Sequence, residues 1–142
     1  MTARTVFLSR LIGLYCILCA TAMLIHRATV VATVTALVND APLMFIVGVL
    51  TLVAGLAMVL AHNVWSGGAA TVVVTVVGWL TLAKGLLFLF LTPAGEARFF
   101  LVDLRYQELF PVYVGISLAL GLYLTYAGFK PAPKSVATAG SG

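Results

Sequence analysis

The stretch that decides the fold runs from Pro42 to Leu91 and reads PLMFIVGVLTLVAGLAMVLA, then HNVWSGG, then AATVVVTVVGWLTLAKGLLFLFL. Its first and third parts are apolar runs of about 20 residues, the length that an α-helix needs to cross the hydrocarbon core of a bilayer. Lys84 is the one charged residue in these two runs. The segment between them ends in Ser-Gly-Gly, which favours a tight turn. We therefore predict two membrane-spanning helices, over residues 42–61 and 69–91, joined by a short loop.

Two further apolar runs flank this hairpin, over residues 6–25 and 111–129. The chain is 63% hydrophobic and 8% charged, whereas soluble domains carry about 25% charged residues. A water-soluble fold of this size could not hide so much apolar side chain. We predict an all-α membrane protein in which residues 1–130 form a bundle of four transmembrane helices. Residues 131–142, which are mostly small or polar, are predicted to be a disordered tail.

The predicted spans carry local signals at their ends. Asp40 is placed to cap the second span, and Pro42 suits its first turn because a missing N–H costs nothing there. Pro111 is predicted to open the fourth span in the same way, and Lys130, followed by a proline, is predicted to end it.

Two connecting segments have the periodicity of helices that lie in the membrane interface. Residues 28–38 would place on one side Val30, Val31, Val34, Leu37 and Val38, and largely opposite them Thr29, Thr33 and Ala36. Residues 95–110 would place on one face Phe99, Val102, Tyr106, Leu109 and Phe110. A solvated helical loop is the alternative for the second segment. We expect both helices on the side of the membrane opposite to the termini.

Basic residues near the helix ends predict the orientation. With four spans, one side would carry Arg4, Arg10, Lys130 and Lys134, and the other Arg27, Arg98 and Arg105. Cytoplasmic segments carry the excess of Lys and Arg, so we expect both termini in the cytoplasm. The sequence Ala20-Thr21-Ala22 is also typical of a signal-peptide cleavage site. The apolar run continues through Ile25, however, so we expect the first span to be retained.

The spacing of the glycines indicates an internal repeat. Gly13 and Gly55 lie 42 positions apart, and Gly78 and Gly121 lie 43 apart. The chain would then read twice as a span, an interfacial helix and a proline-initiated span, which is a parallel repeat. Glycine is frequent in membrane helices, so chance similarity is the alternative.

Lys84 is the candidate functional residue that membrane energetics single out. It lies near the middle of the third span, where a charge costs roughly 2.5–3.5 kcal/mol on insertion scales. The functional interpretation is a counter-charge or a proton-linked group in a polar cavity, with Thr81 and Tyr15 as candidate partners. The alternative is a lysine whose side chain extends along Phe88 toward the interface.

A second polar group, His62-Asn63-Val64-Trp65, follows the second span. One interpretation is a binding cluster at the membrane interface. The other is an interface anchor, in which Trp65 lies at headgroup level while His62 and Asn63 bond carbonyl groups freed at the helix end. The anchor interpretation is favoured because such residues usually lie at this position.

Metal, redox and catalytic chemistry have little support. His26 and His62 are predicted at opposite membrane faces, so they could not share a metal ion, and we expect no cofactor. Cys16 and Cys19 have the CxxC spacing of quinone-linked disulfide-forming membrane proteins, but they lie within a span and a second cysteine pair is missing. The basic residues are scattered, which argues against nucleic acid as a partner. Titratable groups do not converge as catalysis requires.

The site candidates follow an HNxW…GWxxLxKG pattern, made by His62, Asn63 and Trp65 and then by Gly78, Trp79, Leu82, Lys84 and Gly85. This pattern resembles one found in small bacterial inner-membrane proteins and covers about residues 43–91. The resemblance implies a four-helix protein of a bacterial inner membrane and groups Trp79 with the other candidates. It brings no established activity and no catalytic residues.

Three function classes stay open. The favoured class is a non-enzymatic protein that acts by interaction, as an accessory subunit of a larger membrane complex. The alternative is a small solute or ion transporter or channel protomer that works as a homo-oligomer around Lys84. A membrane enzyme ranks last. Small residues in the spans, among them Gly55, Gly78 and Gly121, would pack helices closely, either within the chain or against a second subunit.

Overall fold

The computed structural model describes residues 2–91, 95, 98 and 105–130, and this part of the chain is helical. Its helices are α1 (Ala3–Ile25), α2 (Arg27–Val38), α3 (Ala41–Ala61), α4 (Ala69–Phe90) and α6 (Tyr106–Phe129). All but α2 are long and apolar enough to cross a membrane. The prediction of an all-α protein with four candidate spans is therefore confirmed. The predicted tail lies outside the described residues.

The helix ends follow the local chemistry of the sequence. The hydroxyl oxygen of Thr2 accepts a hydrogen bond from the N–H of Thr5 (3.2 Å), which starts α1 three residues earlier than predicted. Asp40 Oδ1 accepts from the N–H of Leu43 (3.1 Å), so the predicted cap of α3 is confirmed. The turn before α4 uses Gly67 and Gly68 at φ values of 102° and 117°, a region that side chains with a Cβ avoid.

The start of α6 differs from the prediction. This helix begins at Tyr106, so Pro111 lies inside it and does not open it. Arg105 precedes the helix in a left-handed conformation, and its guanidinium forms a 2.9 Å ion pair with Glu108 in the first turn. A proline at this point removes one backbone hydrogen bond, to the carbonyl of Gln107. Half of the predicted interfacial helix over residues 95–110, namely residues 96–97 and 99–104, lies outside the described residues, and its last five residues belong to α6.

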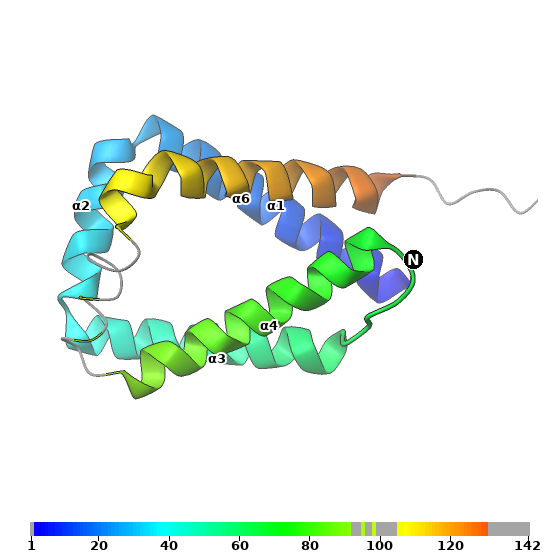
Figure 1. Ribbon diagram of the computed structural model, residues 1–142, viewed down its shortest axis with the longest axis horizontal. Coiled ribbons are helices and arrows are strands. Elements are labelled where there is room, and N and C mark those ends of the chain that lie inside the picture. Colours follow the sequence, from blue (N-terminus) through cyan, green and yellow to red (C-terminus); the bar gives the residue numbers. More distant parts are fainter. Residues whose placement is uncertain (1, 92–94, 96–97, 99–104, 131–142) are drawn as a thin grey trace, which may run out of the picture.

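The helices are arranged as two antiparallel pairs, α1 with α6 and α3 with α4 (Figure 1). The shorter α2 runs across from the end of α1 to the start of α3. We call this side of the molecule the α2 end. The opposite side, where α1 begins and α6 finishes, we call the terminal end.

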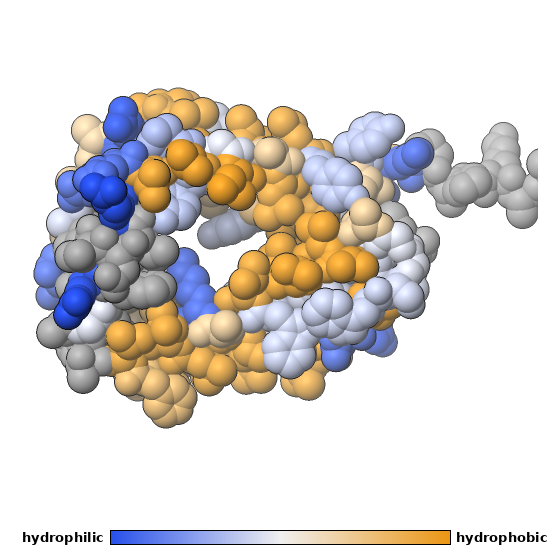
Figure 2. Space-filling model, in the orientation of Figure 1, coloured by the Kyte–Doolittle hydropathy of each residue, from blue (hydrophilic) through white to orange (hydrophobic). Residues whose placement is uncertain are grey.

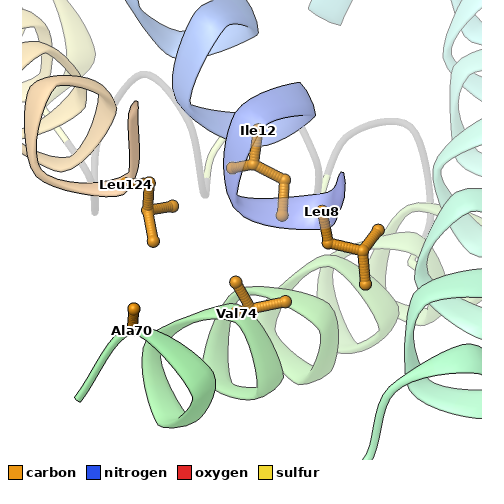
Figure 3. Packing of buried hydrophobic residues seen from close by; sticks show 5 residues of the cluster. All are labelled: Leu8, Ile12, Ala70, Val74 and Leu124. Carbon is orange, nitrogen blue, oxygen red and sulfur yellow. The ribbon is translucent and has the colours of Figure 1, made fainter. Parts of the chain in front are cut away.

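The two pairs meet at the terminal end. There Leu8 and Ile12 of α1 and Leu124 of α6 pack with Ala70 and Val74 of α4, as Figure 3 shows. Toward the α2 end the pairs diverge, and Figure 2 shows the molecule hollowed between them. We call this space the hollow.

Glycines bring the backbones together within each pair. A Cβ added at Gly85 of α4 would lie 2.5 Å from the backbone nitrogen of Leu52 in α3. One added at Gly121 of α6 would lie 3.0 Å from the carbonyl oxygen of Gly13 in α1. These small-residue positions are therefore used for packing inside the chain. Gly115 differs, because an added Cβ there would meet nothing within 4 Å.

The two sides of α2 match the prediction for residues 28–38. Its apolar side chains are half-buried or buried: Val30 and Val31 pack near Phe110 of α6, while Val34, Leu37 and Val38 pack near Met44 and Phe88. Its opposite side is exposed and carries Thr29, Thr33 and Ala36. The helix thus ties the two pairs together at the α2 end.

Candidate functional site

His62 ends α3 and turns its ring toward α4. The backbone N–H of His62 donates to the carbonyl of Met58 (2.8 Å), and its side chain is 3% exposed. Its Nε2 lies 3.4 Å from the carbonyl oxygen of Thr71 in the first turn of α4. Because a carbonyl only accepts, this contact requires the ring proton on Nε2. The imidazole therefore packs between the two helices at the loop that joins them.

Asn63 is the centre of a side-chain hydrogen-bond group. Its Oδ1 accepts from the indole N–H of Trp65 (2.9 Å) and from the indole N–H of Trp79 (3.3 Å). Trp79 can reach back from its position in α4 because helical side chains lean toward the N-terminus of their helix. Both indoles stay partly exposed, at 59% and 43%. The structure thus brings together three of the residues singled out in the sequence.

Thr75 fixes the loop backbone from α4, and the sequence reasoning did not include it among the site residues. Its hydroxyl donates to the carbonyl of Val64 (2.7 Å) and accepts from the N–H of the same residue (3.3 Å). Thr75 is 1% exposed. The available signal was its position one turn after Thr71, since buried hydroxyls in an apolar helix need a partner.

This group of residues, His62, Asn63, Val64, Trp65, Thr71, Thr75 and Trp79, we call the loop lock. Its polar groups bond to one another and to the backbone that α3 leaves without helical partners. Two indoles at the edge of an apolar hairpin are typical of the aromatic belt. The arrangement favours the anchor interpretation of this cluster.

Thr81 and Lys84 lie on a different face of α4. Ala70, Val74 and Val77 of α4 pack in or against the cluster with Leu8, Ile12 and Leu124 at the terminal end. The same stripe continues at helical spacing through Thr81 and Lys84, which therefore face the hollow. Phe88, one turn further on, packs instead with Val38 of α2 and Met44 of α3. Thr81 donates its hydroxyl to the carbonyl of Val77 (2.8 Å). The ammonium of Lys84 lies 5.3 Å from the ring centroid of Phe88.

An equivalent stripe of α1 borders the hollow on the other side. Leu8 and Ile12 pack on α4, and the same stripe continues through Tyr15 and Cys19. Tyr15 is 66% exposed, as expected beyond the point where the pairs diverge. Cys16 and Cys19 are free thiols.

The loop lock and Lys84 lie in different parts of the molecule. His62 contacts Thr71, and Lys84 follows Thr71 by 13 positions along α4, which corresponds to roughly 20 Å at 1.5 Å per residue. The candidates therefore divide into a lock at the terminal end and a cation on the stripe that faces the hollow.

Comparison with protein-family models, with curated proteins and with solved structures found no match to this chain.

Proposed function

We propose that this chain is a non-enzymatic, multi-pass protein of a bacterial inner membrane that acts by holding another membrane component, as an accessory subunit. The observation that carries the proposal is the hollow. Among the residues that the structure describes, the two helix pairs pack directly on each other at the terminal end, and the inner stripes of α1 and α4 diverge beyond this contact. In a bilayer such a space is filled by other molecules. A chain whose own helices leave this space open is therefore suited to bind another membrane component there.

The orientation belongs to the same proposal, with both termini in the cytoplasm and α2 in the opposite interface. Arg4, Arg10 and Lys130 lie at or near the terminal end, and Arg27 and Arg105 precede helices at the α2 end. The exposed Thr29 and Thr33 and the half-buried or buried valines of α2 support its place between headgroups and hydrocarbon.

The internal duplication also stays part of the proposal. In each half of the chain, the first span packs against the second span of the other half, as a two-fold related pair would. The glycine registers differ, however: Gly13 meets Gly121, whereas Gly55 faces Leu82 and Gly78 faces Met58.

A test uses a side chain that fills the hollow. Thr81→Trp projects an indole into it, while Leu50→Trp places the same indole on an exposed position of α3 at 64% exposure. The protein is extracted gently from its native membrane and its native mass spectrum is recorded. We expect wild type and Leu50→Trp to retain a bound component that Thr81→Trp loses. Equal retention by both variants would contradict the proposal.

Lys84 on the inner stripe favours a second candidate, a transporter or channel protomer that works as a homo-oligomer. The same spectrum distinguishes the two. A homodimer that carries a bound ion or solute supports transport, whereas one copy of the chain within a larger assembly supports the accessory role.

A further inference from the structure

The guanidinium of Arg10 in α1 is held in place by the last turn of α6. Its Nε–H donates to the carbonyl oxygen of Gly128 (2.9 Å), and its Cζ lies 4.4 Å from the centroid of the Phe129 ring. Gly128 permits this approach, because an added Cβ there would lie 2.9 Å from Cγ of Arg10. The position of the guanidinium is therefore fixed before any ligand arrives, which reduces the entropy that binding would cost.

The outer edge of the same guanidinium is open to a ligand. A guanidinium has five N–H donors in a planar fork, and Arg10 uses the one on Nε within the chain. Its Nη1 and Nη2 make no hydrogen bond or ion pair in the part of the chain that the structure describes, and the side chain is exposed. These two nitrogens form the edge that can meet two oxygens of one phosphate in parallel.

Arg10 lies at the depth of the lipid headgroups, as the ends of the neighbouring spans indicate. α6 ends at Phe129, the residue whose ring lies against Arg10. α4 begins at Ala69, and Ala70 packs in the same cluster as Leu8 of α1. Leu8 precedes Arg10 by two positions, roughly 3 Å along the helix. Two spans therefore reach their limit at the level of Arg10, on the side of the terminal end.

The terminal end carries positive charge without acidic residues to balance it. The exposed basic residues there are Arg4, Arg10 and Lys130. Residues 1–39 and 109–142 contain no Asp or Glu. Asp40 and Glu108, the acids in the described part of the chain, lie at the α2 end. An anion from outside the chain is therefore the partner whose charge complements this surface.

We propose that Arg10 and Lys130 bind the phosphate of an anionic phospholipid in the leaflet at the terminal end. The phosphate accepts from Nη1 and Nη2 of Arg10, and Lys130, which directly follows Phe129, adds a second positive charge. Toward the hydrocarbon, exposed leucines offer a surface for the acyl chains: Leu14 lies one turn after Arg10, and Leu122 lies two turns before Phe129. This site is on the outside of the α1–α6 pair, so it does not depend on the hollow or on what fills it.

The test measures lipid binding to the purified full chain in detergent by native mass spectrometry. Phosphatidylglycerol and phosphatidylcholine with identical acyl chains are titrated separately, and inorganic phosphate is the third arm. The variants are Arg10→Gln, Lys130→Gln and Arg4→Gln. Arg4 is the matched control, because it is an exposed arginine at the same end of α1 whose guanidinium makes no hydrogen bond, ion pair or ring contact with the described residues.

We expect the first phosphatidylglycerol to bind wild type roughly tenfold more tightly than phosphatidylcholine, as hydrogen bonds to a charged group provide. Arg10→Gln should remove this preference. Lys130→Gln should lower it by about threefold, since an exposed second charge contributes less, and Arg4→Gln should keep it. Denaturation in mixed micelles reports whether each variant is folded. Lys130→Gln decides the matter if Arg10→Gln does not fold, because no hydrogen bond or ion pair within the described residues depends on the Lys130 side chain.

Equal binding of the two phospholipids to wild type overturns the proposal. An equal loss of preference in Arg4→Gln and in the two site variants also overturns it, because the attraction is then that of a positive surface in general. A folded Arg10→Gln that keeps the preference would show that Arg10 serves only to hold the end of α6. If inorganic phosphate binds as tightly as phosphatidylglycerol, the site takes a free anion and the assignment to a lipid is wrong.

Discussion

The α3–α4 pair and the α1–α6 pair are joined by different means. Gly48, Gly55, Gly78 and Gly85 line the α3–α4 contact, and the loop lock satisfies the backbone at its connected end. The α1–α6 pair joins the two ends of the chain. There the Nε–H of Arg10 donates to the carbonyl of Gly128 (2.9 Å), and its guanidinium lies over Phe129. The hydroxyls of Ser9 and Thr125 in this pair are buried without a hydrogen-bond partner among the described residues.

A short loop and a long connection stabilise a helix pair in different ways. In a hairpin joined by a loop of seven residues, contacts made by the loop stabilise the pair, because they hold the two helices in register. The α1–α6 pair has no such loop, and it depends on close packing at Gly13 and Gly121 and on one arginine. We therefore expect the sharpest mutational effects in the α3–α4 pair.

The largest effect is expected for Gly85→Ala. The new methyl group would lie 2.5 Å from the backbone nitrogen of Leu52, so α3 and α4 must separate. Overpacking of this kind costs about 1–3 kcal/mol or more. Gly115→Ala is the matched control, because its methyl group meets nothing within 4 Å and alanine favours a helix. The free energy of unfolding, measured by denaturation in mixed micelles, should fall for Gly85→Ala alone, and an equal change in both would refute the packing argument.

Thr75→Val should have the next largest effect. Valine keeps the shape of threonine but removes the hydroxyl that bonds both backbone groups of Val64. Leaving a buried polar group unsatisfied costs about 1–3 kcal/mol. In Thr81→Val the lost hydroxyl bonds only a carbonyl of its own helix, so its free energy of unfolding should change less. Hydrogen exchange at the Val64 amide gives a second measurement: it should quicken in Thr75→Val and stay as in wild type in Thr81→Val.

A smaller and more local effect is expected for Asn63→Ala. The chain has two tryptophans, and both donate to the same oxygen of Asn63. Their emission should therefore shift, while the exposed position of the three side chains limits the change in stability to about 1 kcal/mol. Asn39→Ala, in the loop before α3, is a control of the same kind. An unchanged emission spectrum for Asn63→Ala would show that the indoles are not held by this amide.

The sequence predicts the elements of this protein better than their packing. Span length, the Asp40 cap and the two sides of α2 are local properties, and the structure confirms them. In hydrocarbon, however, a helix is apolar on the buried and the lipid-facing side alike. Leu60 is 83% exposed and Leu124 is 0% exposed, and nothing in their sequence context separates them. The pairing of α1 with α6 and the hollow could not be predicted for this reason.

The same limit applies to the candidate site. The pattern grouped His62, Asn63 and Trp79 with Lys84. The structure brings Asn63 and Trp79 together with Trp65, although Trp79 lies 16 positions from Asn63. Lys84, in contrast, lies roughly 20 Å further along α4 than Thr71, which His62 contacts. Thr75 lies outside this pattern, and its hydrogen bonds to Val64 depend on where the loop backbone turns. That path is set by Gly67 and Gly68 in conformations that the sequence permits but does not dictate.

The smallest effect, and one of opposite sign, is expected for Ser9→Ala in the α1–α6 pair. Ser9 is 0% exposed and lies against Gly128, yet its hydroxyl has no hydrogen-bond partner in the described part of the chain. Removing an unsatisfied buried hydroxyl relieves its desolvation cost, and alanine is the better helix former. The free energy of unfolding should therefore stay level or rise by about 0.5–1 kcal/mol.

Both Ser9 and Thr75 carry buried hydroxyls. Opposite signs for Ser9→Ala and Thr75→Val would therefore show that hydrogen bonding, and not burial, decides what these hydroxyls contribute to stability. A loss of stability in Ser9→Ala as large as that in Thr75→Val would mean that the hydroxyl of Ser9 is bonded in the membrane, by water or by a shift of Thr125, and that the two pairs are less different than their contacts indicate.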